Sequence, residues 1–266
     1  MRFLDVNPLA LGEIGATLQP GLSSFQNGKW IHGQEAFSVC RIDPQSIRYK
    51  LWENLNLDPV HFPGRMRHAA DLAMTRLQNL CSDLSRDVWT VLTPSHWKKE
   101  QLQVFLGIAA ECRMDVRAMV PRCLIIDLPA DADDWIGWEW HWQRLNRVQL
   151  KRDGEEWRLE ACTHVPEGGV LDFFRRESRS VAKASLESHR LDPLYSGQSE
   201  QVLFEGWWKW HFHQKIWTFE RGGEIMDFSG EAASLRKSHE PWALAQNLKM
   251  NDPQQFFPAG LRHCLT

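Results

Sequence analysis

The stretch from residue 87 to residue 121 most constrains what this chain of 266 residues can fold into. Residues 87–92 are apolar at nearly every position, as is typical of a parallel strand that is buried on both faces. A polar loop follows, in which Ser95 is a candidate N-cap for a helix over 96–112. Further apolar residues from Asp115 onward indicate a second strand. The order of strand, loop, helix and strand predicts a βαβ unit and therefore an α/β fold.

Elements elsewhere in the chain follow from turn signals and periodicity. Asn27-Gly28 is a strong hairpin signal, and the residues from 135 to 143 alternate, with Glu139, His141 and Gln143 on the face opposite the tryptophans. The predicted elements are strands at 2–6 and 12–18, a returning strand at 29–32, the start of a helix at 33–37, a loop over 41–64, a helix over 67–83, strands within 115–128, a hairpin of 135–150 and 156–162, helices over 170–189 and 199–210, and a hairpin over 216–228.

Composition excludes several classes of partner. The net charge of -3 and the pI near 6.4 give no electrostatic reason to expect nucleic acid or an anionic membrane. No apolar run is long enough to predict a membrane span, and the first residues lack the apolar stretch of a signal peptide. The six cysteines form no CxxC pair. We therefore expect reduced thiols and a cytoplasmic protein.

The chain contains 14 tryptophans and only 2 tyrosines. Most of the tryptophans fall within 135–157 and 207–217. This clustering predicts large apolar surfaces that fill the core and an interface between lobes. A platform for carbohydrate or peptide is the alternative, because exposed tryptophan is also a recognition residue.

The order of elements over 1–228 resembles the actin, sugar-kinase and DnaK-type heat-shock chaperone ATPase superfamily, in particular its chaperone branch. A segment at 190–194 also resembles an uncharacterised bacterial family of chaperone-like proteins. The stretches that carry the main resemblance are Gly33-Gln-Glu-Ala36, Val91-Leu-Thr-Pro94, Leu124-Ile-Ile-Asp127 and Gly168-Gly-Val-Leu-Asp172. The resemblance implies a ribonuclease-H-like actin/DnaK-type fold, with a mixed sheet and flanking helices.

The resemblance also implies a division into lobes. Residues 1–126 would form the first lobe, with the order strand, hairpin, helix, strand and helix. Residues 127–266 would form a partial second lobe, with the Trp-rich hairpin and a helical and hairpin insertion. The glycine-rich segment that holds adenosine in the superfamily has no counterpart, so we expect the second lobe to be incomplete.

Proteins of this superfamily hold phosphates on backbone N–H groups of two glycine-containing turns, each of which begins with an aspartate that serves magnesium or a water. Here the first turn reads Asp5-Val-Asn-Pro8 and the second reads Asp127-Leu-Pro-Ala130. Both aspartates are present, but the glycines are not, and proline offers no N–H. We therefore expect most of the affinity for a triphosphate to be lost.

The residues that would remain of a nucleotide site are Asp5, Asn7, Asp127, Gly168 and Gly169. Asp5 and Asp127 would form a magnesium pair, although aspartates at strand ends more often cap turns. No nucleophile elbow, Walker motif or dinucleotide fingerprint occurs, and we assign no catalytic residue.

Four histidines offer further hypotheses. His141 and His164 would lie on the Trp-rich hairpin, where they could act as metal ligands or bases, and His211 and His213 form an HxH pair. In each case a hydrogen-bonded histidine without such a role is the competing interpretation.

Two hypotheses for function follow from this sequence. The first is a chaperone-like protein that is not catalytic, needs no cofactor, and acts by binding a protein partner or a second copy of itself. The second is an ATPase or phosphotransferase that uses ATP and magnesium and whose site is completed by a partner chain. A soluble α/β domain with a coincidental resemblance is the fallback.

Overall fold

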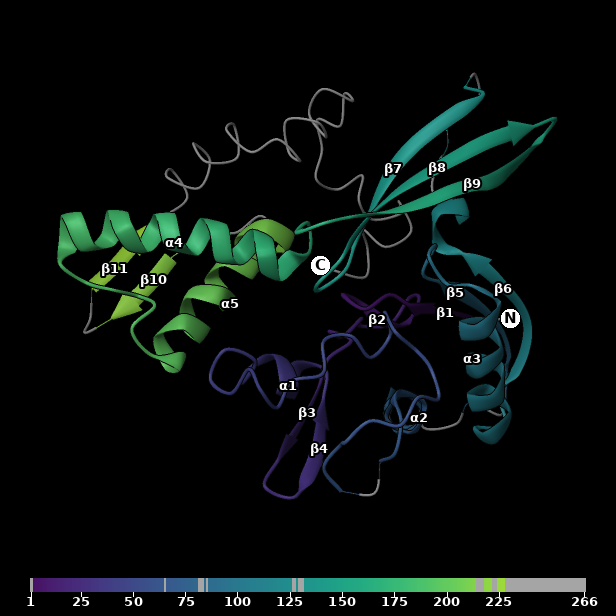
Figure 1. Cartoon of the computed structure of the whole chain (residues 1–266), viewed down its shortest axis with the longest axis horizontal. Coiled ribbons are helices and arrows are strands. Elements are labelled where there is room, and N and C mark those ends of the chain that lie inside the picture. The colour runs from purple at the N-terminus through teal and green to yellow at the C-terminus, as the bar shows by residue number, and fades with distance from the viewer. Residues whose placement is uncertain are drawn as a thin grey trace.

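A mixed four-stranded sheet forms one side of the protein (Figure 1). The structure is a computed structural model that describes residues 2–64, 66–80, 84, 86–125, 128, 132–213, 218–221 and 224–227. The strands lie in the order β2 (Leu11–Glu13), β1 (Arg2–Val6), β5 (Val88–Thr93) and β6 (Asp115–Pro121). β1 is antiparallel to β2 and parallel to β5, and β5 is parallel to β6. The predicted α/β class and the mixed sheet are confirmed.

The βαβ unit that the sequence predicts is present as β5, α3 (Lys99–Glu111) and β6. Together with α2 (Ala69–Leu80), α3 covers an apolar core built around the fully buried side chains of Leu4, Trp89 and Phe105. The predicted N-cap is wrong, because α3 begins at Lys99 rather than next to Ser95. The preceding residues are held outside the helix. The indole N–H of Trp97, for example, donates to the carbonyl of Trp52 at 2.9 Å.

The chain departs from its predicted course after β6. We expected strand structure within 115–128, including a strand that delivers Asp127, but β6 ends at Pro121 and residues Arg122–Ile125 form a 3-10 helix. Proline lacks the N–H that would extend the ladder, and the Arg122 side chain turns inward to pair with Asp5. Asp127 itself lies outside the described residues.

A second, antiparallel sheet contains β7 (Asp134–Trp140), β8 (Leu145–Asp153) and β9 (Glu156–Val165). The predicted single arm over 135–150 is wrong, because it divides into β7 and β8. A tight turn separates them, and it is closed by the His141 N–H donating to the Arg144 carbonyl at 2.8 Å. The predicted turn at Asp153-Gly154 is confirmed.

Two helices and a hairpin complete the described chain. The helices α4 (Val170–His189) and α5 (Gly197–His213) lie apart from the mixed sheet, near β10 (Thr218–Arg221) and β11 (Glu224–Asp227) (Figure 1). Between the helices and the mixed sheet lie β3 (Ser23–Gln26), β4 (Lys29–His32) and α1 (Gln34–Phe37). The turn of the β3–β4 hairpin falls at Asn27-Gly28 as predicted, with positive φ angles of 51° and 81°. None of the described helices is both long and apolar enough to cross a membrane.

An aromatic core joins these helices to the rest of the protein. Trp142 and Trp207 are at most 1% exposed and pack with Phe37, Phe174 and Phe204. This core draws on residues from both sides of position 126, whereas the core under the mixed sheet uses residues from the first side alone. The proposed division into lobes stays a prediction. Every tryptophan among the described residues is buried or half-buried.

A buried polar centre as candidate functional site

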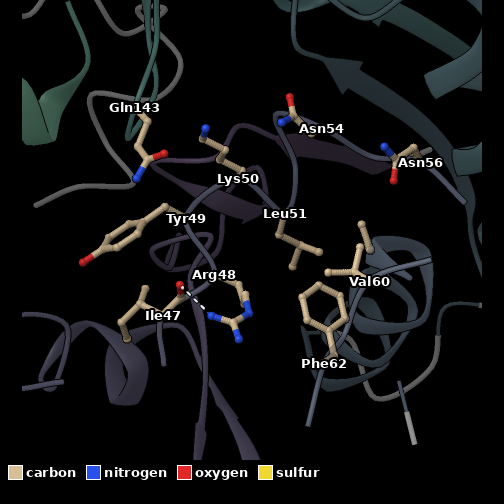
Figure 2. A pocket seen from close by; sticks show the side chains of 11 residues that line it. Ile47, Arg48, Tyr49, Lys50, Leu51, Asn54, Asn56, Val60, Phe62 and Gln143 are labelled. Atoms are coloured by element: carbon tan, nitrogen blue, oxygen red, sulfur yellow. Dashed lines mark hydrogen bonds between the residues drawn. The ribbon is translucent and has the colours of Figure 1, made fainter. Parts of the chain in front are cut away.

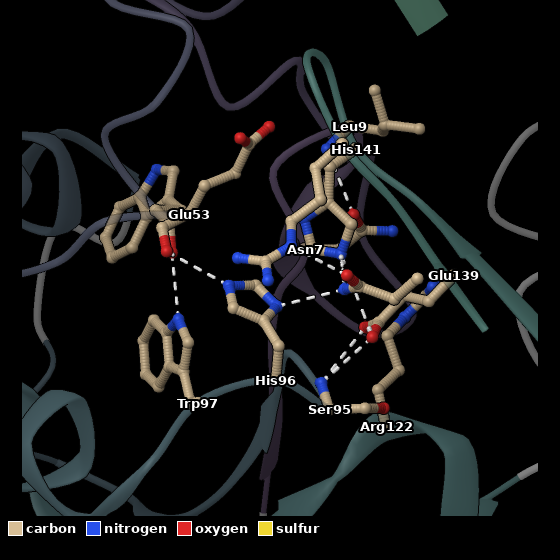
Figure 3. A network of polar contacts seen from close by, with 12 residues as sticks. Asn7, Leu9, Glu53, Ser95, His96, Trp97, Arg122, Glu139 and His141 are labelled. Carbon is tan, nitrogen blue, oxygen red and sulfur yellow. Dashed lines mark hydrogen bonds and ion pairs between the residues drawn. The ribbon is translucent and has the colours of Figure 1, made fainter. Parts of the chain in front are cut away.

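Polar side chains gather where β1 and β5 end and where the turn between β7 and β8 meets them (Figure 3). Ligands of open α/β sheets bind at the carboxyl ends of the strands, so this position is the first place to look for a site. Asp5, His141 and Asn146 are 0% exposed, and Glu139 is 6% exposed. We call this group, with Asn7, Ser95, His96 and Arg122, the polar centre.

The first part of the polar centre is the turn after β1. The Arg122 Nε donates to Asp5 Oδ2 at 2.9 Å, and the Asn7 N–H donates to Asp5 Oδ1 at 3.1 Å. The Leu9 N–H donates in turn to the Asn7 side chain at 3.0 Å. Burial raises the pKa of Asp5, and the charge and hydrogen bond of Arg122 offset part of that rise. Asp5 is therefore a buried carboxyl group with an internal cation.

Glu139 provides the second carboxylate. Its two oxygens lie 2.9 and 3.3 Å from the backbone nitrogen of Ser95, and Oε2 lies 3.7 Å from His141 Nε2. Burial acts to raise the pKa of Glu139, and the charge of the nearby Arg122 acts to lower it. The Ser95 N–H, which the carboxylate accepts, also favours the charged form in this buried position.

Asn146 lies between two imidazoles. The Arg144 Nε donates to its Oδ1 at 2.7 Å, which assigns the amide nitrogen to the opposite side. That nitrogen lies 3.1 Å from His96 Nδ1 and 3.4 Å from His141 Nε2. Because an amide nitrogen only donates, both imidazole nitrogens accept and present lone pairs toward the same point.

His96 is fixed from its other side. Its Nε2 donates to the Glu53 carbonyl at 3.0 Å, and its ring stands at 75° to the His141 ring with a centroid distance of 5.0 Å. Burial, reinforced by His141, lowers the pKa of His96 to about 4. His96 is therefore neutral at pH 7. Burial also raises the pKa of Glu53, whose carboxyl group accepts the Gln143 N–H at 3.2 Å.

The structure brings only some of the predicted site residues together. Asp5 and Asn7 lie in the polar centre, whereas Asp127 falls outside the described residues, so the magnesium pair stays a prediction. Gly168 and Gly169 precede α4. A Cβ atom on Gly169 would lie 2.5 to 2.6 Å from main-chain atoms of Gln143 and Arg144, so this glycine permits a close backbone approach.

Of the histidines that the sequence suggested as ligands or bases, only some lie in the polar centre. His141 is buried in the polar centre, but His164 is exposed and pairs across the sheet with Asn146 rather than with His141. His211 donates to Glu177 of α4 at 2.8 Å, and the side chain of His213 lies outside what the structure describes.

Several members of the polar centre were not predicted from the sequence, namely Ser95, His96, Arg122, Glu139 and Asn146, and neither was the neighbouring Glu53. One signal was available, because the alternation at 139–141 places a glutamate and a histidine on one face of a strand, opposite the tryptophans. His96 carries no such signal, since it reaches the centre only through the packing of a separate segment. Asn146 stands opposite Glu139 because of the turn between β7 and β8, which the sequence did not predict.

A pocket of about 350 Å³ opens beside the polar centre (Figure 2). Gln143 lines it and also donates its N–H to Glu53, which links the pocket to the centre. Its apolar lining comes from Ile47, Tyr49, Leu51, Val60, Phe62 and Ala69, and its polar lining from Arg48, Lys50, Asn54, Asn56 and Gln143. The Arg48 guanidinium lies over the Phe62 ring at 5.4 Å. The pocket therefore combines an apolar wall with two cationic side chains.

No model of a protein family matches this chain, and no curated protein matches it.

Proposed function

We propose that this chain is a chaperone-like protein with a degenerate actin/DnaK-type fold, which is not catalytic and acts by binding a protein partner. The observation that carries the proposal is the buried ion pair between Asp5 and Arg122. In the superfamily that the chain resembles, the corresponding aspartate serves magnesium or a water. Here its carboxylate faces a guanidinium that is 8% exposed.

The turn after β1 supports this proposal because its backbone groups have internal partners. The N–H groups of Asn7, Leu9 and Ala10 each donate within the turn, and Pro8 has none to offer. The Pro8 carbonyl accepts the Trp142 indole N–H at 2.7 Å and the Gly21 N–H at 2.9 Å. A phosphate would have to displace these bonds rather than meet free donors.

The start of α4 supports the proposal in the same manner. A helix N-terminus attracts phosphate through N–H groups that lack partners within the helix. The Val170 N–H donates to the His141 carbonyl at 3.0 Å, and the Leu171 N–H donates to the Trp142 carbonyl at 2.9 Å. The Gly169 N–H faces the Asp172 carboxylate at 3.3 Å. The α4 N-terminus therefore anchors the turn between β7 and β8.

The pocket beside the polar centre supplies a surface for the partner. Val60, which is 42% exposed, lines its exposed side, while Leu51 and Tyr49 form its buried wall. A protein pocket of this size accepts one large apolar side chain. Arg48 and Lys50 favour an acidic group next to it. We therefore propose a partner segment with an apolar anchor and a neighbouring aspartate or glutamate.

Calorimetry with ATP and magnesium tests the first half of the proposal. We expect no heat of binding at millimolar nucleotide, because the N–H groups of the turn after β1 and those at the start of α4 already donate to other partners in the protein. Binding of ATP in the micromolar range, dependent on magnesium, would instead favour the ATPase or phosphotransferase. The Asp5→Asn variant then serves as the control, since it should abolish any magnesium-dependent binding.

Peptide binding tests the second half. The probes are fluorescent peptides with a central leucine or phenylalanine and flanking aspartates, followed by fluorescence anisotropy. Val60→Glu should weaken binding about tenfold or more, because it removes apolar contact and repels the acidic group. Leu186→Glu is the matched control, as Leu186 is 48% exposed on α4 and far from the pocket in sequence. An equal loss in both variants would contradict the pocket as the binding surface.

A further inference from the structure

We infer that the polar centre binds one transition-metal ion of the zinc type through His96 Nδ1, Glu139 and His141 Nε2. One ligand atom from each of these residues lies within 4.8 Å of the other two. The set of two imidazoles and one carboxylate is a known zinc ligand set that leaves a fourth position open. This inference does not depend on the proposed function.

The three side chains converge from separate segments. Glu139 lies in β7 and His141 directly after it, two residues apart, which places both side chains on one face. His96 comes from the loop between β5 and α3. Figure 3 shows His96, Glu139 and His141 pointing toward one another. Such convergence of ligand-type groups is unusual in a structure where most polar side chains lie at the surface.

The lone pairs needed for metal binding already face the centre. Because the Asn146 amide nitrogen donates to both imidazoles, His96 Nδ1 and His141 Nε2 are unprotonated on that side. Neutral imidazole is the form that binds metal. A metal ion would take the place of the Asn146 amide as the partner of both nitrogens.

His141 is poorly satisfied without a further ligand. It is 0% exposed, and its Nδ1 has no hydrogen-bond partner among the described residues. Within the described part of the chain, the contacts of its Nε2 are long, at 3.4 Å to Asn146 and 3.7 Å to Glu139. A buried imidazole normally makes shorter bonds. A metal ion would give its Nε2 a strong partner.

The surrounding contacts orient the other two ligands. His96 donates its far N–H to the Glu53 carbonyl, which is the usual partner arrangement of a metal-bound histidine. Glu139 accepts the Ser95 N–H and keeps further lone pairs for a cation. The imidazole of His141 is the one basic group within 4.0 Å of Glu139 in the described part of the chain, so a divalent ion would also balance a buried negative charge.

The spacing requires a modest closure. Zinc bonds of about 2.0–2.1 Å place tetrahedral ligand atoms about 3.4 Å apart. The Glu139 and His141 atoms are already at 3.7 Å. Small rotations of the His96 and Asn146 side chains would complete the approach. Nitrogen ligands favour zinc, cobalt or nickel over magnesium, which prefers oxygen.

Titration of the full-length, chelator-treated protein with Zn²⁺ against a fluorescent zinc indicator tests the inference. We expect one tight equivalent, and Co²⁺ should give the intense visible absorption of a tetrahedral site. His96→Ala and Glu139→Gln should each weaken Zn²⁺ binding about 100-fold or more. His164→Ala is the matched control, because His164 is an exposed histidine on the neighbouring strand, and it should leave the affinity unchanged.

A variant that should gain affinity for Zn²⁺ keeps the test valid, because misfolding could explain a loss of binding but not a gain. Asn146→Asp replaces the competing donor with a fourth ligand, a second carboxylate, that still accepts from Arg144. It should tighten Zn²⁺ binding about tenfold or more. Absence of a tight equivalent in the wild-type protein would overturn the inference. It would also be overturned if tight binding persisted in the double variant of His96→Ala and His141→Ala, or if Asn146→Asp weakened binding while the protein kept its wild-type circular dichroism.

Discussion

Two buried glutamates, Glu177 in α4 and Glu139 in β7, meet a histidine in opposite ways. At Glu177 the carboxylate Oε2 accepts from Trp207 Nε1 at 2.5 Å and from His211 Nε2 at 2.8 Å. At Glu139 the neighbouring His141 Nε2 is 3.7 Å away and accepts from Asn146 rather than donating to the carboxylate. Both glutamates are at most 6% exposed.

This difference in hydrogen bonding distinguishes a carboxylate that holds two helices together from a carboxylate that is available to bind a ligand. Two donors on Glu177 connect α4 to α5 beside an aromatic core, and the ring nitrogen of the histidine that faces the carboxylate donates to it. Around Glu139 the lone pairs converge without a short bond among them. Burial alone therefore does not identify a site. The direction of donors and acceptors does.

Breaking the ion pair of the polar centre should have the largest effect. Arg122→Leu leaves the fully buried Asp5 without its cation, so the free energy of unfolding should fall by about 3–5 kcal/mol. Urea denaturation followed by tryptophan fluorescence measures this loss.

The double variant of Asp5→Asn and Arg122→Leu is the control. Because it removes both charges, most of the lost stability should return. If the single and double variants were equally unstable, Arg122 would be acting through packing rather than charge.

Gly169 lies where the start of α4 meets the polar centre, and its substitution should have the next largest effect. The Cβ of Gly169→Ala would lie within 2.6 Å of main-chain atoms in the turn between β7 and β8. The start of α4 must then shift away from the carbonyls of His141 and Trp142, at a cost of about 3 kcal/mol in stability. Thermal unfolding should show a lower Tm.

Gly107 offers the matched substitution. It lies within α3, where a Cβ would meet nothing within 4 Å. Gly107→Ala should therefore stabilise the protein by about 0.5–1 kcal/mol. A similar destabilisation at both positions would argue against the close approach at Gly169.

Removing the charge from Glu177 tests whether its hydrogen bonds stabilise the contact between α4 and α5. Glu177→Gln can keep one acceptor for Trp207 and His211, but its amide nitrogen would replace Oε1, which has no partner among the described residues. We expect a loss of about 2 kcal/mol in the free energy of unfolding. Glu187→Gln changes an exposed glutamate on the same helix and should leave stability unchanged. Equal effects would mean that the α4–α5 contact contributes little.

Local patterns allowed much of the fold to be predicted. The βαβ unit, the hairpin at Asn27-Gly28 and the helix over 170–189 each have a signal within a few residues, and all three are present. Boundaries failed where distant contacts decide them. The helix after β5 begins late because Trp97 bonds to Trp52, and the chain after β6 coils into a 3-10 helix where Arg122 reaches Asp5.

The candidate site was harder to predict for the same reason. Asp5 and Asn7 were found because they end a strand in a recognisable turn. Arg122 lies 117 residues from Asp5 along the chain, and His96 lies 50 residues from Asn146. Only the folded chain brings His96 and Arg122 to this centre. The one local signal, a glutamate and a histidine on one face of β7, does not reveal the third ligand.

The smallest expected effect is a loss of stability in acid, and its measurement must separate the polar centre from a second histidine, the half-buried His32. Burial, together with the charge of Arg76, lowers the pKa of His32 to about 4, as burial does for His96. A folded pKa below the unfolded value of 6.5 means that the unfolded chain binds more protons. Stability should therefore be complete above pH 6.5 and fall as the pH decreases toward 4.

His32→Asn removes the hairpin's share of this effect, because the asparagine oxygen can keep the hydrogen bond that His32 Nδ1 makes with Ser23 at 2.8 Å. The share should be about 1 kcal/mol or less, since His32 is only half-buried and solvent screens its charge. Denaturation curves at pH 7 and pH 4.5 measure it. If the variant loses as much stability on acidification as the wild type, the acid sensitivity arises elsewhere, with His96 of the polar centre as the first place to look.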